Sequence, residues 1–155
     1  MRVADDKKFV PVLASADINA GADCDSINMK NVRHAAFHVI FGPTLAGDAI
    51  LTLYEGATDG AKTTALTFAY RYGGAAIGSA SADVYSTEST SAALTATGAT
   101  FVSRHLIIEL DAEKMTDGYD WLTLSISAAA SAGECMVLAE LEPTYKSASG
   151  DSFLT

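Results

Sequence analysis

The sequence predicts an all-β fold, an antiparallel β-sandwich with jelly-roll-like topology. Apolar and polar residues alternate with a period of two in many short segments, which is typical of half-buried strands. Turns rich in Gly, Ser, Thr and Ala separate these segments, and the one helical pattern is too short to be a crossover. Of the 155 residues, 49% are hydrophobic and 19% are charged, a composition that supports a packed core without metals or disulfides.

The first half of the chain contains the clearest strand pattern. In residues 66–72, Leu66 and three aromatic residues alternate with Thr67, Ala69 and Arg71. Residues 34–41 alternate in the same way, and Gly42-Pro43 is expected to end that strand. We expect a hairpin loop and a further strand to follow at residues 44–48 and 50–55, and weaker strands at residues 9–13, 24–29, 84–87 and 92–95.

The second half repeats this organisation. Alternating patterns predict strands at residues 102–110, 122–127 and 134–142, the last ended by Pro143. Residues 111–115 predict a short helical turn, with Asp111 as its N-cap. Residues 73–83 are small and weakly patterned, which predicts a long loop.

All 155 residues are expected to form one domain. It would have an extended N-terminal segment at about residues 1–15 and a polar C-terminal tail at about residues 146–155. The tail ends in Phe153-Leu154 and is either a frayed terminus or an arm that docks on a neighbouring subunit. Residues 1–9 lack the apolar region of a secretory signal, and the longest apolar run is too short to span a bilayer.

The net charge of −9 excludes two classes of partner. A protein that neutralises phosphates needs clustered Lys and Arg, whereas the ten basic residues here are scattered. We therefore expect no binding to nucleic acid and none to an anionic membrane. Acidity of this degree favours solubility and repulsion between free copies.

The sequence contains no recognisable catalytic or cofactor-binding motif, so we predict no enzyme activity, no cofactor and no metal site. His34 and His38 would lie roughly 13 Å apart on a strand, too far to share a metal ion. His105 is left open as a partner of one of them. Cys24 and Cys135 match no metal spacing and are expected to be buried thiols.

Three other functions depend on particular side chains. The acidic residues Asp111, Glu113, Asp117 and Asp120 do not match the spacing of a calcium loop. A carbohydrate- or receptor-binding module, such as a fibre or lectin-like domain, would need exposed aromatic side chains, for which the candidates are Tyr70, Tyr72, Tyr85 and Trp121. A small β-barrel enzyme would need distant residues such as His38, His105 and Glu109 to converge in a pocket.

Three segments resemble a recurring small protein of tailed bacteriophages. They are residues 35–42 (AAFHVIFG), residues 50–72 and residues 106–127 (LIIELDAEKMTDGYDWLTLSIS). The extended segment from residue 7 that precedes the first of them is also similar. Together they cover most of the chain, and they resemble head decoration, or cement, proteins.

The resemblance implies a structural virion protein that binds the outside of the capsid and stabilises the shell. The partner implied is the major capsid protein, with self-association as a dimer or trimer, assembly in the host cytoplasm and a final location on the virion exterior. No residue role is carried over from the family. Because arms commonly arise at chain ends, the residues expected to contact the partner are Val3, Phe9, Val10, Val12, Phe153 and Leu154.

Deletion of residues 1–8 is expected to leave the fold intact and to weaken capsid attachment. Circular dichroism and a shell-binding assay would check the two parts of this prediction. Normal attachment of the truncated chain would contradict the assignment of an N-terminal arm.

Overall fold

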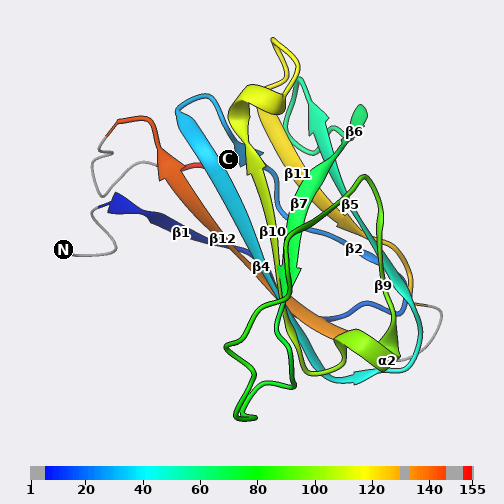
Figure 1. Cartoon of the computed structure of the whole chain (residues 1–155). Coiled ribbons are helices and arrows are strands. Elements are labelled where there is room, and N and C mark those ends of the chain that lie inside the picture. The colour runs from blue at the N-terminus through cyan, green and yellow to red at the C-terminus, as the bar shows by residue number, and fades with distance from the viewer. Residues whose placement is uncertain (1–5, 130–132, 146–151, 155) are drawn as a thin grey trace.

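Two antiparallel sheets pack face to face around one core in the computed structural model, which describes residues 6–129, 133–145 and 152–154 (Figure 1). Sheet A has the order β1 (Lys8–Asp17), β12 (Gly133–Pro143), β4 (Val32–Leu45), β10 (His105–Asp111), β7 (Phe68–Tyr72) and β8 (Ser89–Ser91). Sheet B has the order β2 (Ala22–Asp23), β11 (Trp121–Ile126), β5 (Ala49–Gly56) and β6 (Thr64–Leu66), with β3 (Ile27–Asn28) paired to β11 and β9 (Leu94–Ala96) paired to β5. The prediction of an all-β sandwich is confirmed.

The strand order is that of a jelly roll. β2 and β3 pair with opposite ends of β11, so together they form one interrupted edge strand. For this count β2 and β3 are one strand, and β7, β8 and β9 are left out. The remaining eight strands, numbered in chain order, are placed 1-8-3-6 in sheet A and 2-7-4-5 in sheet B. Successive strands therefore cross repeatedly between the sheets, as in a double Greek key. β7 and β8 then extend sheet A beyond β10.

Period-two alternation builds the core. On β4, Ala35, Phe37, Val39 and Phe41 are at most 1% exposed and face sheet B. β10, β12, β11 and β5 contribute inward residues in the same way, and the largest fully buried side chains come from these strands together with Ile18, Ile27 and Phe68. The sequence alternates at these positions because one face of each strand is buried in the core.

The prediction of one strand at residues 66–72 is wrong. Leu66 ends β6 in sheet B, and Phe68 begins β7 in sheet A. Both side chains are buried between the sheets, and the chain changes sheet at Thr67 between them. A period of two reports which side chains face the core but not which strand the backbone pairs with, so the pattern continues across the change.

The prediction that Gly42-Pro43 ends a strand before a hairpin loop is also wrong. β4 continues to Leu45, because the pairing of Gly133 with Leu45 extends its contact with β12. Pairing with β10 stops at Ile40, so Pro43 occupies a position with a free edge, where its missing N–H costs nothing. Residues 46–48 then connect β4 in sheet A to β5 in sheet B, so no hairpin forms here.

A short helix, α2 (Gly98–Phe101), follows β9 and was not predicted. It packs against the end of β4 so closely that a Cβ atom on Gly98 would lie 2.1 Å from the carbonyl oxygen of Leu45. The chain leaves α2 through Val102 and Arg104, so the strand predicted from residue 102 begins instead at His105. The ring of Phe101 is the part of α2 that is buried in the core.

The other predicted elements are partly confirmed. The helical turn is the 3-10 helix η1 (Ala112–Lys114), and Asp111 lies at its N-cap position without a capping side-chain bond. Residues 9–13 lie in β1, and the strands predicted at 24–29 and 92–95 are shifted or shortened to β3 and β9. Residues 84–87 contribute only an isolated bridge between Tyr85 and Gly73, and residues 73–83 form the predicted loop.

Replacement of Phe37 by alanine is expected to lower the free energy of unfolding by about 3–5 kcal/mol, because the ring is fully buried and the rigid sheets cannot close the cavity. Phe9→Ala is the matched control, since that ring is 41% exposed and its loss should cost clearly less. Urea unfolding of both variants measures the difference. Equal losses would contradict this account of the core.

Candidate functional site

The outer face of sheet A is a broad surface that mixes apolar and titratable side chains. One cross-strand row runs Leu138, His38, Ile107 and Arg71, on β12, β4, β10 and β7. The next row contains Met136, Ile40 and His105. Met136 is 40% exposed, and the other apolar members are partly buried by their neighbours. A mixed surface of this kind is a feature of protein-binding faces.

A chain of hydrogen bonds crosses this face through two histidines. Nδ1 of His38 lies 3.0 Å from Nε2 of His105, and we call these two residues the histidine pair. The other nitrogen of His38, Nε2, lies 3.1 Å from the Glu140 carboxylate, which also binds Lys7 at 3.1 Å. The other nitrogen of His105, Nδ1, lies 2.6 Å from the hydroxyl of Tyr85.

The direction of the chain follows from its carboxylate end. An ionised Glu140 only accepts hydrogen bonds, so His38 donates from Nε2 and accepts at Nδ1. His105 then donates from Nε2 and accepts from the Tyr85 hydroxyl at Nδ1. The two rings are inclined by only 21° with centroids 5.1 Å apart, as in an edge-to-edge hydrogen bond. Every member is satisfied with both imidazoles neutral.

Burial and charge shift the pKa values of two members. Burial, and then the charge of a protonated His38, lower the pKa of His105 below its ordinary value. Burial alone would raise the pKa of the Glu140 carboxyl, but hydrogen bonds from Lys7 and His38, with their charges, outweigh it and lower that pKa. The first shift favours a neutral His105, and the second favours an ionised Glu140 carboxylate.

His34 belongs to a separate cluster at the other end of the face. Its Nδ1 lies 2.8 Å from Asp111, and its Nε2 lies 3.5 Å from Glu109. Glu109 therefore does not join the histidine pair, although the enzyme alternative placed these three residues together. At the edge of the cluster Arg33 forms an ion pair with Glu142, whose pKa it lowers.

A loop of residues 73–85, here called the projecting loop, extends away from the sandwich beyond β7 (Figure 1). The bridge between Gly73 and Tyr85 closes its base. Backbone bonds fix it further, including Ile77 N–H to the Ser103 carbonyl at 2.7 Å. The Arg104 guanidinium donates to the carbonyl oxygens of Gly73 and Gly74 at 3.0 and 3.2 Å.

The projecting loop exposes apolar side chains that have no role in the core. Ile77 is 52% exposed, Val84 is 62% exposed and Tyr85 is 39% exposed. Asp83 is the one charged residue in the segment, although the chain as a whole is strongly acidic. The projecting loop therefore combines exposed apolar side chains with little charge, and contiguous exposed apolar patches often mark binding sites.

The residues predicted to contact a partner are distributed differently. Phe9 is exposed on β1, whereas Val10 and Val12 are buried in the core of this chain. Phe153 is also buried, its carbonyl accepts the N–H of Asn28 at 3.0 Å, and Leu154 packs against the core. Val3 lies outside the described residues. Val10, Val12, Phe153 and Leu154 therefore pack on their own sandwich, and Phe9 is the exposed member among the described candidates.

The candidate carbohydrate-binding aromatic side chains do not gather in one place. Tyr70 and Tyr72 pack against the core, where Tyr72 contacts Phe101 with ring centroids 5.1 Å apart. Tyr85 lies on the projecting loop, and Trp121 begins β11 in the other sheet. No stacking platform of the kind that binds sugars forms from these four residues.

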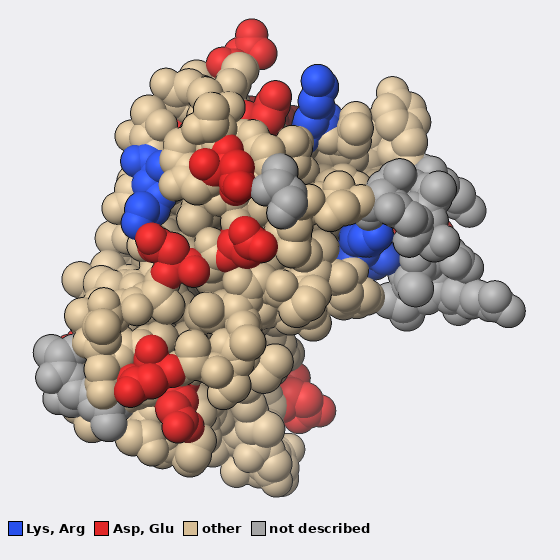
Figure 2. Space-filling model, turned by 180° about the vertical axis from the view of Figure 1, so that it is seen from behind, with Lys and Arg blue, Asp and Glu red and all other residues tan. Residues whose placement is uncertain are grey.

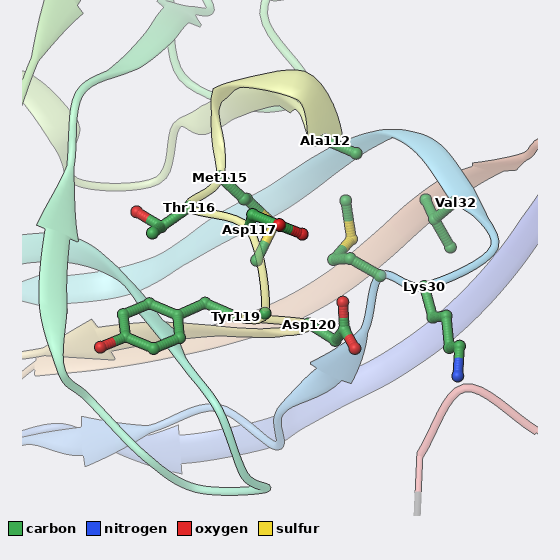
Figure 3. A pocket seen from close by; sticks show the side chains of 10 residues that line it. Lys30, Val32, Ala112, Met115, Thr116, Asp117, Tyr119 and Asp120 are labelled. Atoms are coloured by element: carbon green, nitrogen blue, oxygen red, sulfur yellow. The ribbon is translucent and has the colours of Figure 1, made fainter.

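A depression of about 310 Å³ lies around the turn that contains η1 (Figure 3). In that view Tyr119 and Lys30 lie on opposite sides of it, with Met115 and Asp117 between them. Glu55 stabilises this turn. Its carboxylate is fully buried and accepts hydrogen bonds from the N–H and the hydroxyl of Thr116 at 2.7 and 2.6 Å. Glu55 thus has a structural role, and it was not singled out from the sequence.

Charge and thiols are arranged as the composition suggests. Acidic side chains are spread over the molecule seen from behind, with fewer basic ones among them (Figure 2). Cys24 and Cys135 are free and buried, and burial raises the pKa of both thiols, that of Cys135 to about 11. Within the described ranges, no helix has the length and hydropathy needed to cross a membrane.

Comparison with known proteins identifies no relative: no family model, no curated protein and no solved structure matches the chain.

The lowered pKa of His105 predicts that the protein becomes less stable to unfolding as the pH falls. The unfolded chain takes up this proton at about pH 6.5, whereas the folded chain resists it, so the free energy of unfolding decreases as the pH falls from about 7.5 to about 5.5. Urea unfolding at several pH values measures the decrease. His105→Gln removes the titrating group and should make the decrease shallower, and an unchanged pH dependence in this variant would contradict the assignment.

Proposed function

We propose that this protein binds the outer surface of a bacteriophage capsid and stabilises the shell, as a decoration or cement protein. The observation that carries the proposal is the projecting loop, which holds Ile77 and Val84 in solvent on a fixed backbone. Leaving such side chains exposed costs solubility, and a partner surface that covers them explains their presence. The major capsid protein is the partner proposed.

Several features support this function over a catalytic one. A rigid jelly-roll sandwich presents its loops in fixed positions, which suits a protein that must fit a repeating surface. The net charge of −9 suits the exterior of a shell rather than a place beside packaged DNA. The resemblance of residues 35–42, 50–72 and 106–127 to head decoration proteins supports the same role.

Self-association as a dimer or trimer at a symmetry position of the shell is part of the proposal. Each copy is acidic, so free copies are expected to repel one another. The copies would then associate only where the shell holds them side by side. A location on the virion exterior, after assembly in the host cytoplasm, follows from the same function.

Quantitative mass spectrometry of purified virions tests the role. A copy number that is a simple fraction or multiple of that of the major capsid protein supports a shell protein. A handful of copies would favour a receptor- or carbohydrate-binding module at a fibre or vertex. Complete absence from the virion would overturn the proposal.

The double replacement Ile77→Ser with Val84→Ser is expected to weaken binding to undecorated shells at least about tenfold, because both side chains would be desolvated at the interface. Co-sedimentation with shells measures the affinity. Ile50→Ser is the matched control, since Ile50 is 42% exposed on β5 in the other sheet. Equal binding by the double variant and the control would contradict the role of the loop.

A further inference from the structure

The histidine pair lies on the outer face of sheet A, where water can reach it. Two imidazole nitrogens, Nδ1 of His38 and Nε2 of His105, converge to 3.0 Å from neighbouring strands. We propose that the histidine pair binds a divalent transition-metal ion that prefers right angles between its ligands, namely Cu²⁺ or Ni²⁺. This inference is independent of the proposed attachment to a capsid.

The distance between the nitrogens selects the class of ion. At a metal–nitrogen distance of about 2.1 Å, two ligands at a right angle lie about 3.0 Å apart, and two at a tetrahedral angle lie about 3.4 Å apart. The observed 3.0 Å is the hydrogen-bond distance of the metal-free pair, and it needs little change to reach the right-angle value of square-planar or octahedral coordination. Tetrahedral Zn²⁺ would require the two strands or their side chains to separate.

The outer nitrogens of both rings are already held as they are in metal sites. A metal-bound histidine usually donates its second N–H to an oxygen atom, which fixes the ring and its tautomer. His38 makes this bond to the Glu140 carboxylate at 3.1 Å. His105 has the Tyr85 hydroxyl at 2.6 Å from its second nitrogen. Two independent positioning contacts therefore surround the convergent nitrogens.

Metal binding is expected to occur without net uptake or release of a proton at this site. In the metal-free pair the proton between the rings lies on Nε2 of His105, and Nδ1 accepts from Tyr85. On binding, that proton moves through solvent to Nδ1 of His105, which then donates to the Tyr85 oxygen. His38 keeps its proton on Nε2 toward Glu140, and both rings turn so that the two nitrogens, which face each other along the hydrogen bond in the metal-free pair, both point toward a shared position.

The surroundings favour a cation that water can reach. His38 is 22% exposed, so open coordination positions face solvent and are filled by water. The lowered pKa of His105 keeps its imidazole neutral and able to bind a metal near neutral pH. In the part of the chain that the structure describes, no group of three or more His, Cys, Asp and Glu side chains is placed to hold a metal, so the chain supplies two ligands.

Isothermal titration of the tag-free full chain with Ni²⁺ tests the proposal, because Ni²⁺ does not oxidise the free thiols. We expect one site that is lost in His38→Gln and in His105→Gln. His34→Gln is the matched control and should bind as the unmodified chain does, since His34 lies with Asp111 and Glu109 instead. Affinity should fall as the pH drops below about 6.5, where protons compete for the rings.

Tyr85→Phe tests the positioning contact and should weaken Ni²⁺ binding about tenfold, whereas Tyr145→Phe, at an exposed tyrosine, should not. If a histidine variant fails to fold, paramagnetic broadening in the unmodified chain decides, because at low Ni²⁺ the ring signals of His38 and His105 should broaden, with those of the adjacent Tyr85, before the ring signals of His34. No Ni²⁺ binding, binding that survives both histidine replacements, or equal loss in His34→Gln would overturn the proposal.

Discussion

The pairing of β4 between β12 and β10 is the constraint on which the rest of the molecule depends. β4 is hydrogen-bonded along both edges, so its register fixes which side chains face sheet B and which face solvent. Phe37 and Val39 enter the core, and His38 between them points to the outer face. A slip of one residue would exchange these faces, burying the histidine and exposing the ring.

The same constraint produces the histidine pair. His105 begins β10 opposite Ile40, two residues along from the partner of His38, so the two imidazoles meet diagonally across the strands. Glu140 reaches the pair from β12 on the other side of β4. Three strands that the core holds in register therefore place four polar atoms within hydrogen-bonding distance, with no loop required except the one that carries Tyr85.

The projecting loop is connected to this framework at its base rather than at its tip. Arg104 binds the carbonyl oxygens of Gly73 and Gly74, and Tyr85 binds His105. Ile77 and Val84 are thus exposed on a backbone that hydrogen bonds hold in place. The core, by contrast, takes up Val10, Val12 and Phe153 near the chain ends.

The sequence by itself determined the all-β class, the buried face of β4, β10, β11 and β12, the turn at η1 and the burial of both thiols, because alternation and composition directly report burial. Tertiary structure alone decided that residues 66–72 divide between two sheets at Thr67, that β4 passes Pro43, and that the partner of His38 is His105 while Glu109 joins His34. These outcomes depend on which strands become neighbours. A period of two carries the direction of each side chain, whereas the identity of the neighbouring strand is set by contacts between residues far apart in the chain.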